Sequence, residues 1–231
     1  NSRADGNAQA ARGDAARGNT AWGAAEAAFP AWSASHIQER SNALDKVGTE
    51  NRARKEELGT LMAREEGKTK AEGIGEAGRA GQIFKFFAGE CLRLGGETIP
   101  SVRPNIGVEI TREPIGVVGL ITPWNFPIAM ITRKAGPALA AGCTIVIKPA
   151  AETPLCALAL AALAEQAGIP AGVINIVTSH QASVVGDELC RNPKVRKLSF
   201  TGSTRIGKLL MRQCADTMKR LSLELGGNAP F

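Results

Sequence analysis

The second half of the chain alternates short apolar runs with longer stretches of helical periodicity. Strands of a parallel sheet are buried on both faces, so they appear as continuous runs of Val, Ile and Leu. Five strands are predicted, at residues 115–121, 144–148, 173–177, 197–201 and 221–225. Helices are predicted between them, at residues 128–141, 154–167, 182–191 and 203–217. This alternation predicts an α/β fold, a parallel sheet with helices on both faces, and ligands at the carboxyl ends of the strands.

The first half of the chain has a different pattern. Residues 1–20 are rich in Ala, Gly, Arg, Asn and Asp without apolar periodicity, so we expect a disordered lead-in there. Apolar residues at helical spacing predict a helical part over residues 21–97. Strand-forming residues around Pro and Asn-x-Gly then predict a β-hairpin arm at 98–113, ahead of an α/β core at 114–231.

Charge and composition narrow the class of protein. The 231 residues carry a net charge of +6, but the basic residues are interspersed with acids, and there is no Tyr. We therefore expect no nucleic-acid partner, since no basic patch with stacking aromatics is present. The longest uncharged run, residues 114–132, contains three prolines and Asn125, and it would make a poor membrane-spanning helix. We expect no membrane partner either.

The five cysteines are widely spaced and odd in number, and no CxxC pair occurs. The two histidines have no neighbours at metal-ligand spacing, so neither a zinc site nor a disulfide framework is expected. A reducing, cytoplasmic location fits this cysteine usage. Cys143 lies at the entrance of a predicted strand, where we expect a buried residue rather than a nucleophile.

The first predicted strand ends in TPWNFP, a rigid loop around Asn125. Two prolines restrict the backbone, and Trp124 and Phe126 are expected to anchor the loop. A rigidly held amide suits an oxyanion hole, because it donates a hydrogen bond without charge or reorganisation. The alternative is an Asn that caps the following helix.

Two further strand ends carry candidate binding residues. Lys148 ends the second strand, where it is either a surface lysine or a contact to a ribose hydroxyl or phosphate. After the fourth strand, Gly202 allows close backbone approach, and Ser203 begins a helix whose free N–H groups attract phosphate. The same stretch nearly matches a P-loop, but Leu209 stands where a Mg²⁺-binding hydroxyl is required. The alternative of a P-loop nucleotide hydrolase is therefore weak.

The fifth strand, LSLEL, alternates leucines with Ser222 and Glu224, which must point to the opposite face. We expect this strand to be buried. Glu224 is then either a buried carboxylate satisfied by amides or a lysine, or a general base whose pKa is raised by burial.

In this order and spacing, the motifs PWNFP, KPAAETP, FTGSTRIG and LELGG resemble the aldehyde dehydrogenase superfamily. The resemblance implies a Rossmann-like cofactor domain for NADP or NAD, with Asn125 as oxyanion-hole donor and Glu224 as the general base. In that chemistry a cysteine thiolate attacks the aldehyde, hydride passes to the nicotinamide, and the base activates water against the thioester. The residues that match cofactor contacts are Ile121, Thr122, Pro123, Trp124, Lys148, Pro149, Ala150, Ala151, Gly202, Ser203 and Leu225.

Two positions narrow the substrate and the cofactor. The segment around Arg133 is similar to succinate-semialdehyde dehydrogenases, in which the matching arginine binds the distal carboxylate of the substrate. Ala151 stands where NAD-preferring relatives often have Glu, so the resemblance implies that NADP is accepted and preferred. Glutarate or ketoglutarate semialdehyde stays open as the substrate, as does a nucleotide-binding module without catalysis.

The family's nucleophilic cysteine has no match among the five present, and its catalytic domain is absent from the sequence. We therefore expect a catalytically incomplete fragment of a parent enzyme. The arm at 98–113 matches the segment that relatives use for subunit pairing, which implies a homo-oligomeric parent, a dimer or a tetramer.

Overall fold

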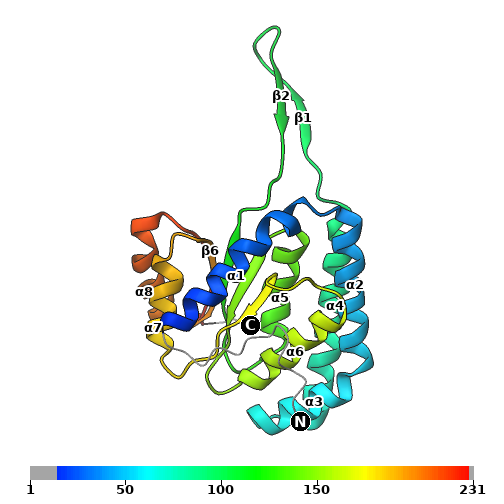
Figure 1. Ribbon diagram of the computed structural model, residues 1–231, viewed down its shortest axis with the longest axis vertical. Coiled ribbons are helices and arrows are strands. Elements are labelled where there is room, and N and C mark those ends of the chain that lie inside the picture. Colours follow the sequence, from blue (N-terminus) through cyan, green and yellow to red (C-terminus); the bar gives the residue numbers. More distant parts are fainter. Residues whose placement is uncertain (1–14, 229–231) are drawn as a thin grey trace.

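The computed structural model describes residues 15–228, in which a sheet lies between two layers of helices and a hairpin projects from the body (Figure 1). The helices are α1 (Ala15–Ala34), α2 (Ile37–Ala53), α3 (Lys55–Glu66), α4 (Lys70–Cys91), α5 (Ala129–Ala140), α6 (Pro154–Gln166), α7 (Ala182–Arg191) and α8 (Thr204–Cys214), followed by the 3₁₀ turn Ala215–Thr217. The strands are β1 (Glu97–Pro100), β2 (Gly107–Ile110), β3 (Val117–Ile121), β4 (Thr144–Lys148), β5 (Ile174–Ile176), β6 (Val195–Gly202) and β7 (Arg220–Leu225).

The five-stranded sheet has the order β5-β4-β3-β6-β7, and all its neighbouring strands are parallel. Strand β3, the first strand of this sheet in the sequence, lies in its middle. The next two strands, β4 and β5, are added on one side of β3, and β6 and β7 are added on the other side. The predicted α/β fold is confirmed, and the predicted strand limits agree with the observed ones to within two residues.

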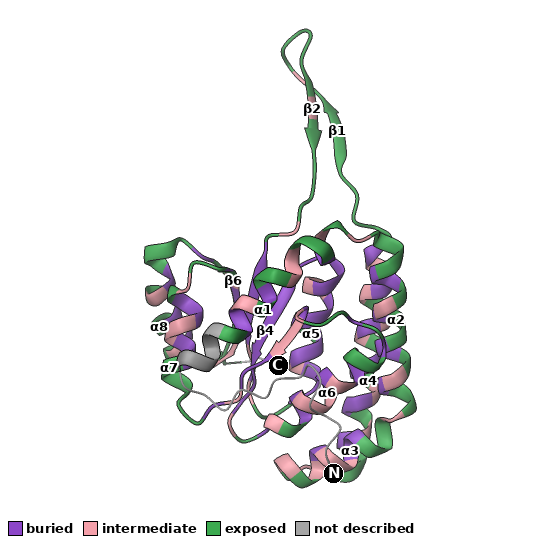
Figure 2. Cartoon of the chain, viewed as in Figure 1, coloured by how far each residue is buried: buried purple, intermediate pink, exposed green. Residues whose placement is uncertain are grey.

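Each face of the sheet has its own helical layer. The α5 face, named here for its central helix, receives Val118, Leu120 and Ile147 and is covered by α5 and α6, against which α2 and α4 pack. The opposite α1 face receives Val146 and Leu198 and is covered by α1, α7 and α8. Because both faces are covered, the central strands are buried along their length, as Figure 2 shows.

Helix α1 begins inside the segment that was expected to be disordered. Residues 15–20 belong to the helix, so the prediction is wrong for them, while residues 1–14 lie outside the described part. The helix is held by its apolar side: Trp22 and Ala25 are buried on the α1 face, and the Thr144 hydroxyl donates to the Ala25 carbonyl at 2.8 Å. Alanine has a high helix propensity, so little free energy is needed to form the first turns of this helix. The packing of Trp22 and Ala25 is therefore sufficient to stabilise the helix from residue 15.

Helices α3 and α4 approach each other closely through glycines. A Cβ added at Gly73 would lie 2.5 Å from the Gly59 carbonyl oxygen, and one at Gly59 would lie 2.4 Å from the backbone nitrogen of Ile74. A second contact of this kind joins α2 to α4, where a Cβ at Gly48 would lie 2.7 Å from the Gly81 carbonyl oxygen. Only residues without a Cβ allow these backbones to come so near.

The hairpin β1–β2 projects from the body and is exposed along its length (Figures 1 and 2). Several of its apolar side chains face solvent, among them Ile99, Val102 and Ile106. Among the described residues, no helix is both long and apolar enough to cross a bilayer.

Candidate functional site

The strand ends that carry the predicted site residues meet at the carboxyl edge of the sheet. Ile121 at the end of β3 is in register with Lys148 at the end of β4, and Gly202 of β6 with Leu225 of β7. The Thr122 amide donates to the Lys148 carbonyl at 3.3 Å, which joins the loops after β3 and β4. The remaining predicted contacts follow these strands directly: Pro123, Trp124, Pro149, Ala150, Ala151 and Ser203.

Lys148 is 6% exposed, so its interpretation as a surface lysine is wrong. Burial lowers the pKa of its ammonium, and the nearby Glu152 partly offsets that effect. The hydroxyl groups of Thr122 and Thr153, which flank the same edge, are buried without a hydrogen-bond partner in the described residues. A buried cation and unsatisfied hydroxyls fit a polar ligand rich in hydroxyl groups or phosphate, such as a nucleotide.

Ser203 caps α8 as predicted, because its Oγ accepts from the Ile206 amide at 3.4 Å. The first turn of this helix therefore stands at the carboxyl edge of β6, and its amide groups favour an anion. Gly207 and Lys208 lie inside the helix rather than in a loop around a phosphate. A Cβ at Gly207 would meet Leu225, so this glycine serves the packing of α8 on β7, and the P-loop interpretation is wrong.

Asn125 does not cap the next helix. Its backbone carbonyl accepts from the Lys68 ammonium at 3.0 Å, while the first amides of α5 are bound by the carboxylate of Glu76. Within the described residues, the Asn125 side-chain amide has no hydrogen bond and is available to donate to a ligand. The expected anchoring by Trp124 and Phe126 is wrong, since both are about half exposed; Phe126 instead lies under the Lys68 ammonium, 4.5 Å from ring centroid to nitrogen.

Glu224 lies on the α5 face, opposite Leu221 and Leu223, as the alternation predicts. Its side chain is 54% exposed, so the expectation of a buried carboxylate is wrong. The reason is that β7 is an edge strand of the described chain and α5 does not extend over it. The carboxylate accepts from the Thr201 hydroxyl at 3.1 Å and from the ammonium of Lys134 at 3.3 Å.

Sequence reasoning missed Lys134, whose side chain is only 3% exposed. It reaches from α5 to the Ser199 hydroxyl at 3.0 Å and to Glu224, linking the helix to β6 and β7. Burial lowers the pKa of Lys134, while the charge of Glu224 raises it. A lysine three residues after the buried Ile131 was the available signal, since that spacing places it on the apolar side of α5. Its neighbour Arg133 is exposed on the same helix.

Cys143 is 3% exposed and precedes β4, far along the sheet from the carboxyl edge. Burial raises the pKa of its thiol, which opposes formation of a nucleophilic thiolate. All five cysteines are free and buried. Within the described residues, no cluster of three or more metal-binding side chains occurs.

The comparisons with known proteins agree with this arrangement. The chain is 54% identical over 208 residues to the glutarate-semialdehyde dehydrogenase of Pseudomonas aeruginosa and, over the same length, to the NADP(+) succinate-semialdehyde dehydrogenase of Escherichia coli. Each match covers 90% of this chain and 43% of the relative, so the chain spans less than half the length of these relatives. The crystal structure of an NADP-dependent enzyme of E. coli superposes with a TM-score of 0.92 at 52% identity, covering 95% of this chain and 46% of that one.

The family model for aldehyde dehydrogenases matches residues 3–231, which include every strand and every strand-end loop described above. Both this match and the high identity to the two semialdehyde dehydrogenases lead to one conclusion: the chain belongs to the aldehyde dehydrogenase family.

Proposed function

We propose that the protein carrying this chain oxidises a carboxylated semialdehyde to the acid, with succinate semialdehyde as the first candidate and NADP or NAD as the oxidant. The observation that supports this proposal most is that Asn125 and Glu224 both lie at the carboxyl edge of the sheet. Their loop and strand end stand at the same edge of the sheet as Lys148 and Ser203, which fit a nucleotide. Glutarate semialdehyde is the alternative substrate, in keeping with the similarity to that dehydrogenase.

Each group has a role in this proposal. A nicotinamide cofactor held at this edge by Lys148 and Ser203 would supply the hydride acceptor for the reaction. The Asn125 amide donates to the oxygen of the tetrahedral intermediate, and Glu224 takes a proton from the water that hydrolyses the thioester. Lys134 holds the Glu224 carboxylate through its ammonium. The five cysteines of this chain are buried, so the proposal requires a thiolate from a part of the enzyme outside these 231 residues.

Cofactor preference follows from the loop after β4. Ala151 itself presents no carboxylate that would repel a 2′-phosphate, and Lys148 supplies a cation at the same strand end, beside the exposed Glu152. We therefore propose NADP as the preferred cofactor, as in the E. coli relative. The exposed apolar hairpin suits pairing with a second subunit, so we propose a homo-oligomer, and the free cysteines suit a cytoplasmic location.

The test uses the full-length enzyme that carries this chain, assayed with succinate, glutarate and ketoglutarate semialdehydes and an uncharged aldehyde, with each cofactor. We expect the highest kcat/KM with succinate semialdehyde and NADP.

Arg133→Ala should raise KM for the carboxylated aldehydes about 10- to 100-fold, because a charged hydrogen bond is lost, and leave KM for the uncharged aldehyde almost unchanged. Arg191→Ala is the matched control, since Arg191 ends α7 and pairs with Asp187 away from the carboxyl edge. Equal effects on all aldehydes would remove Arg133 from the substrate site.

A further inference from the structure

The loop between β3 and α5, residues 122–128, is buried at its ends through Thr122 and Ile128, but its middle, around Asn125, is exposed. Trp124 and Phe126 are about half exposed, and the loop contains no regular structure. Besides the bond from Thr122 to Lys148, two side chains that bind the loop come from the helical part of the chain, more than fifty residues earlier in sequence. They are Glu76 of α4 and Lys68 of the turn between α3 and α4.

Glu76 is 6% exposed, and its carboxylate is fully engaged. Oε1 accepts from the amides of Ile128 and Ala129, at 3.0 Å each, and Oε2 accepts from Lys68 at 2.6 Å. The first amides of a helix have no partner within the helix, and a negative charge there is stabilised by the helix dipole. The carboxylate therefore fixes the point at which the loop becomes α5.

Lys68 fixes the other half of the loop. Its ammonium donates to the Asn125 carbonyl at 3.0 Å, contacts the face of Phe126, and lies 3.1 Å from Glu66 Oε2. Burial disfavours the charge on Lys68, but hydrogen bonds to Glu76 and Glu66 outweigh burial and raise its pKa. A single buried ion pair thus bonds both the backbone of Asn125 and the start of α5.

We infer that the Lys68–Glu76 ion pair positions Asn125 for its role as oxyanion-hole donor, an inference that rests on the proposed function. A donor to an oxyanion must be held in place before the reaction, and a displacement of about 1 Å can cost about 100-fold in rate. Lys68 and Glu76 are positioning residues in this scheme. They act through the backbone of the loop, whereas the Asn125 amide acts on the substrate.

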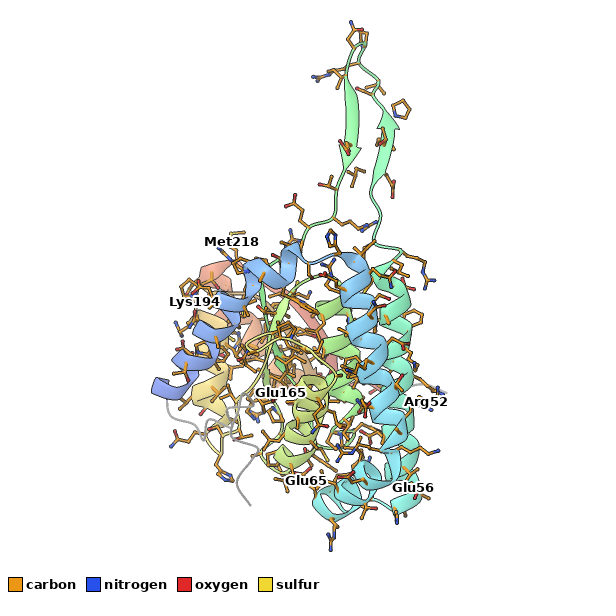
Figure 3. The ribbon with its side chains drawn as sticks, turned by 45° about the vertical axis from the view of Figure 1, so that its right-hand side comes forward. Arg52, Glu56, Glu65, Glu165, Lys194 and Met218 are labelled. Carbon is orange, nitrogen blue, oxygen red and sulfur yellow. The ribbon has the colours of Figure 1, made fainter. Side chains whose placement is uncertain are left out.

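A second carboxylate of the helical part, that of Glu65, binds the loop between β4 and α6 and allows a comparison with Glu76. Glu65, at the end of α3 (Figure 3), accepts from the amides of Leu155 and Cys156 at 2.5 and 2.9 Å. These amides begin α6, which follows β4 and the Lys148 loop. The helical part therefore holds two strand-end loops by the same device: Glu76 the loop with the proposed catalytic amide, and Glu65 the loop with the proposed cofactor lysine.

The experiment measures steady-state kinetics of the full-length enzyme carrying this chain. Glu76→Gln and Lys68→Met should each lower kcat about 10- to 100-fold, with KM for the cofactor changed less than about threefold. Lys68→Arg, which keeps the charge, should restore most of the loss. Glu65→Gln should instead raise KM for the cofactor. Lys85→Met is the matched control, because Lys85 also pairs α4 with a carboxylate, Asp45, but away from the loop.

A double-mutant cycle separates positioning from general destabilisation. If Glu76 acts through Asn125, Glu76→Gln should lower kcat less than about twofold in an Asn125→Ala background. Faster amide exchange at residues 128–130, measured in water far below the urea midpoint of each variant, would show that the loop is loosened in a folded protein. Unchanged kcat in both variants, or an effect that persists in full without the Asn125 amide, would overturn the inference alone. A wild-type enzyme that oxidises no aldehyde would overturn the proposed function, and the inference with it.

Discussion

The close contact between α3 and α4 allows one substitution, Gly to Ala, to be tested in two environments on the same helix. In α4, a Cβ at Gly73 would lie 2.5 Å from the Gly59 carbonyl oxygen, while one at Gly75 or Gly78 would meet nothing within 4 Å. All three glycines lie inside the helix, so the intrinsic gain from Ala is similar. Any difference between the variants therefore reports the packing of α4 against α3.

The magnitudes follow from these contacts. Replacing Gly by Ala inside a helix stabilises it by about 0.8–1.0 kcal/mol. Overpacking usually costs about 1–3 kcal/mol, and the upper end applies to Gly73, because the obstructing atom belongs to a backbone that cannot rotate away. We expect Gly73→Ala to lower the free energy of unfolding by about 1–2 kcal/mol, and Gly75→Ala and Gly78→Ala to raise it by about 0.5–1 kcal/mol.

Urea unfolding of the chain, followed by circular dichroism, measures this difference. With an m-value of about 2–3 kcal/mol/M, the midpoints of the Gly73 and Gly75 variants should differ by roughly 1 M at equal m. Gly59→Ala is an independent replicate, since its Cβ would lie within 2.7 Å of three atoms of Ile74. Equal midpoints for Gly73→Ala and Gly75→Ala would refute the argument that backbone contact sets the spacing of these helices.

Two further predictions concern buried titratable groups. Burial raises the pKa of the thiols of Cys143 and Cys190, and all five cysteines are buried. Ellman's reagent should therefore label none of them quickly in the folded chain and all of them in urea. Rapid labelling of Cys143 in the folded chain would contradict its buried position. Burial lowers the pKa of Lys134 and Lys148, so between their lowered pKa values and about 10.4 the unfolded chain binds more protons, and stability should rise with pH. Lys134→Met and Lys148→Met should reduce that rise in urea unfolding across pH 7–10, whereas an undiminished rise would show that these amines keep their ordinary pKa.

The sheet could be predicted from the sequence because burial on both faces leaves a local trace. The run at 144–148 is apolar at its three central positions, and β4, which is buried along its whole length, has the same limits as that run. The strand ends were also predictable, since proline, glycine and serine there have defined backbone roles. The exposure of Glu224 could not be predicted, because the alternation of residues shows on which face of the sheet a side chain lies but not which element covers that face.

The support of Asn125 could not be predicted for a different reason. Glu76 and Ile128 are 52 positions apart, and nothing in the local pattern of either segment names the other. A partial signal exists in α4, where Glu76 lies among the buried Gly73, Ala77 and Ala80. An acid on the buried side of a helix requires a partner, yet only the tertiary structure shows which backbone amides provide it.

The position of α1 in the sequence, far ahead of the sheet that it covers, has a consequence for synthesis on the ribosome. Helix α1 is made well before the sheet that it covers: the bond from Thr144 to Ala25 spans 119 positions. At about 5–20 residues per second, this interval is roughly 6–24 s. During that time Trp22 and its neighbours have no sheet to cover, so the nascent helix presents an apolar stripe to chaperones until β3 and β4 emerge.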